Sequence, residues 1–193
     1  MKAFFQVSTA APESFAGDVA VYILQQDNWS KEGALPPALA DAVSHLVDCG
    51  DLFAEGEQNV WLYPALMDWK GGRPCMVKRI LLMALQSEEA GNNAVREKLR
   101  LCAGTIAQQV RRIDAEKVLV FAPSGLSLPQ AEVVEELIQG MVLGGYTFYG
   151  YKRTPKDTDK KGREKEPAEQ TCQVYLHIEG ISEKEQHLPI KQA

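Results

Sequence analysis

Two continuous apolar runs constrain the fold of this chain more than any other feature. Val77–Leu85 has the sequence VKRILLMAL, and Lys117–Ala122 has the sequence KVLVFA. A strand with one wet face alternates apolar and polar residues, whereas consecutive apolar residues are typical of a strand buried on both faces of a parallel or mixed sheet. We therefore predict that both runs are central strands of such a sheet.

A long amphipathic helix is predicted between these two strands. Asn92 or Asn93 is its expected N-cap. Its apolar residues recur every three or four positions, which is the period of a helix with one buried face: Val95, Leu99, Cys102, Ile106, Val110 and Ile113. The last helix is expected after Ser127, which has the Ser-x-x-Gln spacing of a capping box with Gln130. Its apolar stripe consists of Val133, Val134, Leu137, Ile138, Met141 and Val142.

Four shorter segments have the β-branched and aromatic content of strands: Ala3–Val7, Asp18–Leu24, Asn59–Tyr63 and Cys172–Ile178. Pro36 and Pro37 open a further helix, and Trp69–Pro74 is predicted to form a hairpin turn. Strands that alternate with helices predict a three-layer α/β fold, with a mixed, mostly parallel central sheet of about six strands and helices on both faces. We expect one domain over residues 1–178, with a charged loop at 152–171 and a polar tail at 179–193.

Charge and hydropathy exclude some classes of partner. The formal net charge of −5 argues against nucleic acid as the main partner. The segment 152–165 differs, because its seven basic and three acidic residues give it a charge of +4 (7 − 3). That segment could contact nucleic acid, although a solvated linker has the same composition. No apolar run approaches the roughly 18–20 residues that a membrane span needs, so we expect a soluble, cytoplasmic protein without a membrane partner.

The sequence contains no recognisable constellation for catalysis. No metalloprotease, serine-hydrolase or P-loop pattern occurs. His45 lies at helical spacing from Asp41 and Asp48, which could form a metal corner, but a surface helix of mixed charge has the same pattern. The cysteines are widely spread and are expected to be reduced thiols: Cys49, Cys75, Cys102 and Cys172. We therefore predict no catalytic, cofactor-binding or metal-ligating residue in this chain.

Two strand ends are candidate ligand sites, because α/β proteins bind ligands at the carboxyl edge of the sheet. Ala84–Ser87 ends one apolar strand but has no glycine that would let a ligand approach the backbone. Pro123–Ser127 lies between a strand and a helix, a position where helix N-termini bind phosphate. A plain connecting loop has the same composition, so the phosphate site stays a hypothesis.

The stretch 140–152, GMVLGGYTFYGYK, resembles the amino-terminal domain of the leucyl (cytosol) aminopeptidase family. Six residues fall on that family's pattern at the end of a helix: Gly140, Leu143, Tyr146, Phe148, Tyr151 and Lys152. The order of elements over residues 1–155 is similar as well. Ala84 and Gln86 stand where the family has glycines, and this is a departure from its pattern. The resemblance implies an α/β fold of the macrodomain type.

The same resemblance implies a non-catalytic domain of a metal-dependent exopeptidase that removes N-terminal amino acids. Such a domain would serve oligomer assembly or regulation, and its partners would be further copies of itself or its own catalytic domain. The two divalent metals of the family, zinc or manganese, belong to a carboxy-terminal domain whose Asn-Thr-Asp-Ala-Glu-Gly-Arg motif is absent here. We therefore expect no cofactor in this chain. The alternatives are a stand-alone macrodomain-like ligand-binding module and nucleic-acid contact through the basic segment 152–165.

The stretch also carries a packing prediction. Gly144 and Gly145 lower helix propensity by roughly 1 kcal/mol each relative to alanine, so another backbone or a bulky side chain is expected to pack against them. The four aromatic rings that follow are predicted to be buried around the end of the helix: Tyr146, Phe148, Tyr149 and Tyr151.

Overall fold

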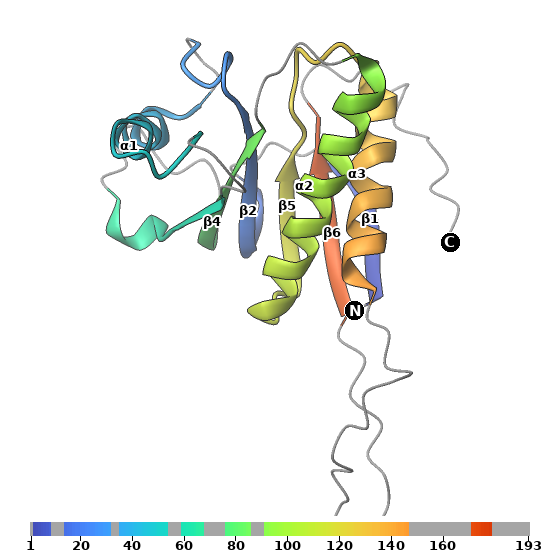
Figure 1. Ribbon diagram of the computed structural model, residues 1–193. Coiled ribbons are helices and arrows are strands. Elements are labelled where there is room, and N and C mark those ends of the chain that lie inside the picture. The colour runs from blue at the N-terminus through green and yellow to red at the C-terminus, as the bar shows by residue number, and fades with distance from the viewer. Residues whose placement is uncertain are drawn as a thin grey trace, which may run out of the picture.

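The computed structural model describes residues 2–8, 14–31, 35–53, 59–67, 76–85, 91–146 and 171–178. Strands and helices alternate along these residues, as Figure 1 shows. The strands are β1 (Lys2–Ser8), β2 (Ala16–Gln25), β3 (Asn59–Leu62), β4 (Met76–Leu85), β5 (Lys117–Phe121) and β6 (Thr171–His177). The helices are α1 (Pro37–Asp48), α2 (Asn92–Arg112) and α3 (Gln130–Gly145), with a short 3-10 turn, η2 (Pro64–Leu66), after β3.

The described strands form one sheet of six strands in the order β1-β6-β5-β2-β4-β3. Neighbouring strands are parallel except for β3, which pairs antiparallel with β4 at the edge. The helices cover both faces of this sheet: α1 lies on one face, and α2 and α3 lie side by side on the other (Figure 1). The predicted fold, a mixed and mostly parallel α/β sheet between helices, is confirmed.

The central strands are buried on both faces, as their continuous apolar runs predict. Ile80, Leu81, Leu82 and Met83 of β4 are all buried, and alternate members of this run pack in different cores. Leu81 and Met83 contact the core under α2 and α3, while Ile80 and Leu82 contact the core under α1. A run without alternation therefore supplies apolar side chains to two layers at once.

The two helices α2 and α3 run parallel and approach each other closely. Arg96 bonds to Glu132 and Arg100 bonds to Glu136, so the same offset of 36 residues persists along both helices. A Cβ atom added to Gly144 would come within 3.0 Å of the backbone of Gly104 on α2. A Cβ added to Gly140 would likewise come within 3.0 Å of the backbone of α2. These glycines let the two backbones meet without an intervening side chain.

The packing prediction for the glycine pair is confirmed at Gly144, whose partner is the backbone of Gly104. Gly145 is buried. The prediction for Tyr146 is wrong, because its side chain is 72% exposed. The helix ends at Gly145, and Tyr146 is already extended, so its side chain leaves the layer instead of following the buried stripe. Phe148, Tyr149 and Tyr151 lie outside the described residues.

The predicted helix caps are wrong, although the helices themselves are confirmed, and so are their apolar stripes except at Val142, which is 45% exposed near the end of α3. Gly91 is the N-cap of α2 and Pro129 is the N-cap of α3, and neither helix has a side-chain cap hydrogen bond. The Ser-x-x-Gln box is displaced because Gln130 is the first residue of α3 instead of its third. The hairpin turn Trp69–Pro74, the charged loop 152–171, apart from its last residue in β6, and the tail 179–193 lie outside the described residues.

Candidate functional site

The connections after β2 and β5 leave the sheet in opposite directions. After β2 the chain continues through α1 to β3 and β4, on one side of β2. After β5 it continues through α3 to β6, on the other side. Because β2 and β5 are parallel neighbours, a crevice opens between the two connections at the carboxyl ends of the strands. Open α/β sheets bind their ligands at such a point.

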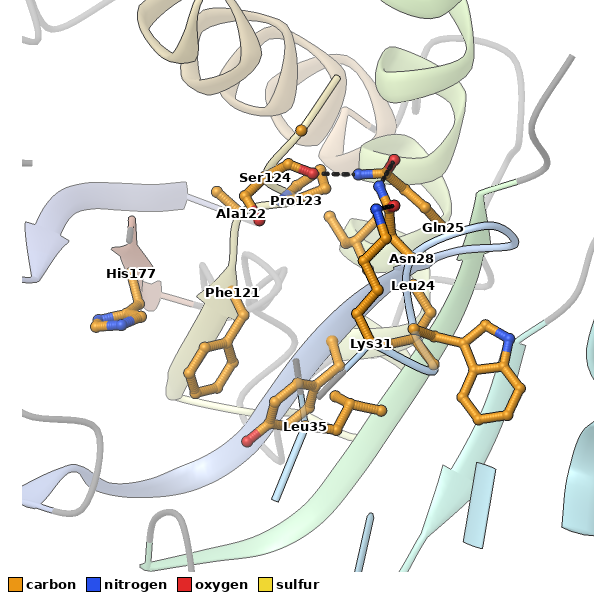
Figure 2. A pocket seen from close by; sticks show the side chains of 14 residues that line it. Leu24, Gln25, Asn28, Lys31, Leu35, Phe121, Ala122, Pro123, Ser124 and His177 are labelled. Carbon is orange, nitrogen blue, oxygen red and sulfur yellow. Dashed lines mark hydrogen bonds between the residues drawn. The ribbon is translucent and has the colours of Figure 1, made fainter. Parts of the chain in front are cut away.

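A cleft of about 390 Å³ lies at this point, within the range of small-molecule sites. Figure 2 shows Phe121 to Ser124, from β5 and the segment after it, on one side. Gln25, Asn28 and Lys31, from the end of β2 and the turn after it, lie on the other side (Figure 2). His177, at the end of β6, also lines the cleft. Three parallel strands therefore supply its walls, and residues far apart in the sequence meet there.

Hydrogen bonds connect the two sides of the cleft. The Gln25 amide nitrogen donates to the carbonyl oxygen of Ser124 across the opening, at 2.6 Å. The Asn28 amide donates to the Gln25 side-chain oxygen at 2.7 Å, and the Lys31 ammonium donates to Asn28. Gly125 has a φ of 77°, a left-handed conformation suited to glycine, and a Cβ there would approach the Asn28 amide. This chain of polar groups holds the rim of the cleft together.

Aromatic rings form the floor of the cleft. Tyr22 of β2 stacks on Phe121 of β5, with ring centroids 4.2 Å apart and planes inclined by 13°. The Phe121 ring in turn meets the His177 imidazole edge to face, at 5.2 Å. Nδ1 of His177 is buried and has no hydrogen-bond partner among the described residues. The floor therefore consists mainly of aromatic rings.

Part of the candidate ligand site Pro123–Ser127 lines the cleft. Pro123, Ser124 and Gly125 line it, whereas Ser127 does not. The lining stops before α3 begins at Gln130, so the first turn of that helix does not face the cleft and the phosphate hypothesis gains no support. Ala84 and Leu85, at the end of β4, do not line it either, and residues 86 and 87 lie outside the described residues.

Sequence reasoning missed the β2 side of the cleft. Gln25, Asn28 and Lys31 belong to no motif, and only the topology brings them opposite Ser124. His177 was not predicted as a site residue, because a histidine in the alternating pattern of a strand is accounted for by the strand itself. The signal available in the sequence was general, namely polar residues directly after a predicted strand.

The metal-corner hypothesis at His45 gains no support. His45 is exposed on α1. Among the described residues, no group of three or more His, Cys, Asp or Glu side chains is arranged to hold a metal ion. The helices of the described part of the chain include none that is long and apolar enough to cross a membrane.

Ionisable groups with shifted pKa values lie away from the cleft. At the opposite end of β2, the Asp18 carboxylate accepts from Lys78 and from the backbone N–H groups of Glu116 and Lys117. The Lys78 hydrogen bond, more than the others, lowers the pKa of Asp18, while burial opposes it. Burial, with the nearby Asp18 charge, raises the pKa of the Cys172 thiol to about 11. Neither residue lines the cleft.

Comparison with known proteins relates the chain to one family. Residues 71–155 match the cytosol aminopeptidase family, N-terminal domain. A probable cytosol aminopeptidase of Desulfotalea psychrophila is 30% identical over 140 residues, which cover 72% of this chain and 27% of that protein. One from Roseiflexus castenholzii is 26% identical over 155 residues, covering 80% of this chain and 28% of that protein. The chain thus spans about a quarter of the length of these curated relatives.

Solved structures show the same fold at low identity. A tomato leucine aminopeptidase mutant aligns with 92% of this chain and 32% of its own length, with a TM-score of 0.54 and 14% identity. A macrodomain mutant from Oceanobacillus iheyensis aligns with 94% of this chain and 85% of its own length, with a TM-score of 0.58 and 11% identity. Another mutant of that macrodomain, solved with ADPR, has a TM-score of 0.54 at 13% identity, over 94% of this chain and 86% of its own length. These likenesses show that the fold is of the macrodomain type.

Proposed function

Because the chain belongs to the cytosol aminopeptidase family through its amino-terminal domain, we propose that it is a non-catalytic domain that assembles or regulates a metal-dependent aminopeptidase. The observation that carries this proposal is the match of residues 71–155 to that domain of the family. Its relatives are probable cytosol aminopeptidases about four times as long as the matched part. The activity itself would then belong to residues that this chain does not contain.

The metals implied by the family do not fit the described residues. A two-metal hydrolytic site needs several carboxylate or imidazole ligands at one place. Within the described ranges, the His, Cys, Asp and Glu side chains form no such group. We therefore assign no step of peptide hydrolysis to this chain and expect no metal dependence of its own folding.

Exposed apolar side chains at the end of α3 support the assembly role. Val142, Leu143 and Tyr146 are 45%, 69% and 72% exposed, and they lie within little more than one helical turn. A cluster of exposed apolar residues is typical of a surface that contacts another protein. The partner would be a second copy of this domain or the catalytic domain.

Sedimentation equilibrium of purified residues 1–193, alone and with the catalytic half of a family member, tests this role. We expect association that Leu143→Asp weakens about tenfold or more, because the charge must be desolvated in the contact. Leu66→Asp is the matched control, since Leu66 is 85% exposed but lies on η2, away from α3. A chain that stays monomeric and ignores the catalytic half would overturn the assembly role.

A second assay tests the non-catalytic assignment. Purified residues 1–193 should release no amine from leucine amide with Zn²⁺ or Mn²⁺ present. Release that a chelator abolishes, and that survives further purification, would show that the chain is itself a peptidase.

The cleft favours a second candidate function, which is ligand binding by a stand-alone module. It has the volume and the topological position of a binding site. Calorimetry with ADP-ribose and with nucleotides tests this candidate, and heats equal to those of dilution for every compound would remove it.

Nucleic-acid contact through segment 152–165 stays a prediction, because that segment lies outside the described residues; a gel shift at low salt tests it.

A further inference from the structure

We propose that the cleft between the connections after β2 and β5 binds a flat aromatic compound that carries a single anionic group. This inference rests on the second candidate function, ligand binding by the cleft, and adds the chemical class of the ligand. Three properties of the lining support it: the aromatic content, the sign of the charge and the scarcity of glycine.

The aromatic content of the lining favours a flat ring. Phe121 is part-exposed and lines the cleft (Figure 2). Trp29, from the turn after β2, also lines the cleft and is part-exposed. Rings that meet in stacked or edge-to-face geometry gain more than their buried area alone provides. A ligand ring can therefore extend the contacts that Tyr22, Phe121 and His177 already make with one another.

The charge of the lining favours an anion. Of the 14 lining residues that the structure describes, Lys31 is the only lysine or arginine, and none is an aspartate or a glutamate. Lys31 bonds to the neutral Asn28 amide and makes no ion pair with any acid of the described residues. An anionic group can replace this neutral partner and gain a charge-assisted hydrogen bond.

The lining residues that the structure describes include no carboxylate, which disfavours the compounds that an aminopeptidase handles. A free amino acid or a peptide has an ammonium group, which loses hydration in a cleft and needs an anion to compensate. Among the described lining residues, Lys31 is the only lysine or arginine, and its ammonium would repel that group. We therefore expect the substrates and products of peptide hydrolysis to bind the cleft more weakly than an anion does.

The scarcity of glycine favours one anionic group over a diphosphate. Loops that bind diphosphates use several glycines, so that successive backbone N–H groups can reach the phosphates. Gly125 is the only glycine among the lining residues that the structure describes, and Pro123 has no N–H group. The single ammonium group of Lys31 and the short loop at Pro123–Gly125 are enough to bind one anionic group.

Two-dimensional ¹H–¹⁵N NMR titration of the full chain tests the assignment. The probes are naphthalene-2-carboxylate, its neutral amide 2-naphthamide, the zwitterion 2-naphthylalanine and ADP-ribose. We expect saturable shifts from the carboxylate at Gly125, at the Trp29 indole and at the end of β6. The amide and the zwitterion should bind about three- to fivefold more weakly, the scale of one exposed charge contact, and ADP-ribose should not exceed the carboxylate.

Variants separate the contributions of charge and ring. Lys31→Gln should remove the preference for the carboxylate over the amide, whereas Arg112→Gln should preserve it. Arg112 is the matched control because it is exposed at the far end of α2. Phe121→Leu keeps an apolar side chain without a flat ring and should weaken both naphthyl probes about equally.

The outcomes distinguish failure of the ligand class from failure of ligand binding. ADP-ribose that binds more tightly than the carboxylate, or equal affinity for carboxylate and amide, overturns the single-anion assignment and leaves the cleft a binding site. No saturable shift with any of the four probes overturns the binding function as well. Shifts at α2 and α3 instead of the cleft contradict both.

Discussion

The two sides of the sheet are built differently. On one side, α2 and α3 meet backbone to backbone at Gly104 and Gly144, and ion pairs join them along their length. On the other side, at the carboxyl edge, the connections after β2 and β5 leave a cleft that side-chain hydrogen bonds bridge at its rim. Helices that meet backbone to backbone leave little room for a ligand between them, whereas the cleft has room, and we expect it to contribute less to stability.

The largest effect is expected at the glycine contact of the helix layer. In Gly144→Ala the new methyl group meets the backbone of Gly104, which cannot move without separating the helices. We expect a loss of at least about 2 kcal/mol in the free energy of unfolding, which corresponds to a fall of about 4–8 °C in Tm. Urea and thermal unfolding measure both.

Gly104→Ala is the matched control on the facing helix. A Cβ there would lie 3.6 Å from the Gly140 carbonyl oxygen, which is an ordinary contact distance. Because alanine favours a helix by up to about 1 kcal/mol over glycine, this variant should be as stable as the parent or more stable. Equal losses in both variants would show that the contact is not the close approach described here.

A smaller effect is expected at the ion pairs between the same helices. The Glu136 side chain is 7% exposed and bonds to Arg100, with Arg96 at 3.8 Å, whereas the Glu132 side chain is 38% exposed. Glu136→Ala should cost about 2 kcal/mol in unfolding free energy, because it leaves two guanidinium groups facing an emptied site. Glu132→Ala should cost below about 1 kcal/mol. A reversed order would show that burial does not govern these pairs.

Asp18 provides a test that depends on pH. Its pKa is lowered in the folded protein, chiefly by the hydrogen bond from Lys78, so the carboxylate stabilises the fold above its unfolded pKa of about 3.9. That contribution is lost as the pH falls through the lower, folded value. Asp18→Asn should therefore cost about 1 kcal/mol at pH 7 and progressively less below about pH 4. A difference that does not change with pH would contradict the role of the charge.

The smallest effect on stability is expected at the cleft. Lys31→Gln removes an exposed charge that, among the described residues, bonds to Asn28, so the unfolding free energy should change by less than about 0.5 kcal/mol. The same change should alter anion binding, as proposed above. A large loss of stability would show that the rim is a structural clamp, and the contrast between the two sides would fail.

The sequence predicts the layers of this fold well, because the spacing of apolar residues along a strand or helix depends on how many of its faces are buried. The runs at β4 and β5 require two covered faces, and the stripe of α2 requires one. The helix starts were predicted poorly, since Gly91 and Pro129 precede their helices without any side-chain cap bond that a motif could signal. Several neighbouring residues can serve as the N-cap of a helix, and the sequence alone does not show which of them does.

Contacts between distant segments were the hardest to predict. The glycine pair 144–145 suggested a close approach, but nothing in one sequence identifies Gly104 as the partner 40 residues earlier. The cleft is similar, because Ser124 was a candidate while Gln25 and Lys31 were not. Both features arise from the order of strands in the sheet, which places residues together that share no motif.

Amide hydrogen exchange under native conditions tests the contrast between the two sides most directly. The N–H of Trp29 donates to Gln25 at 3.2 Å on the cleft rim and can be compared with the N–H groups of α2 and α3 around Gly104 and Gly144. We predict that the helix amides share one opening free energy equal to that of global unfolding and that the Trp29 amide opens at a lower one. Helix amides that open as easily as Trp29 would contradict the account.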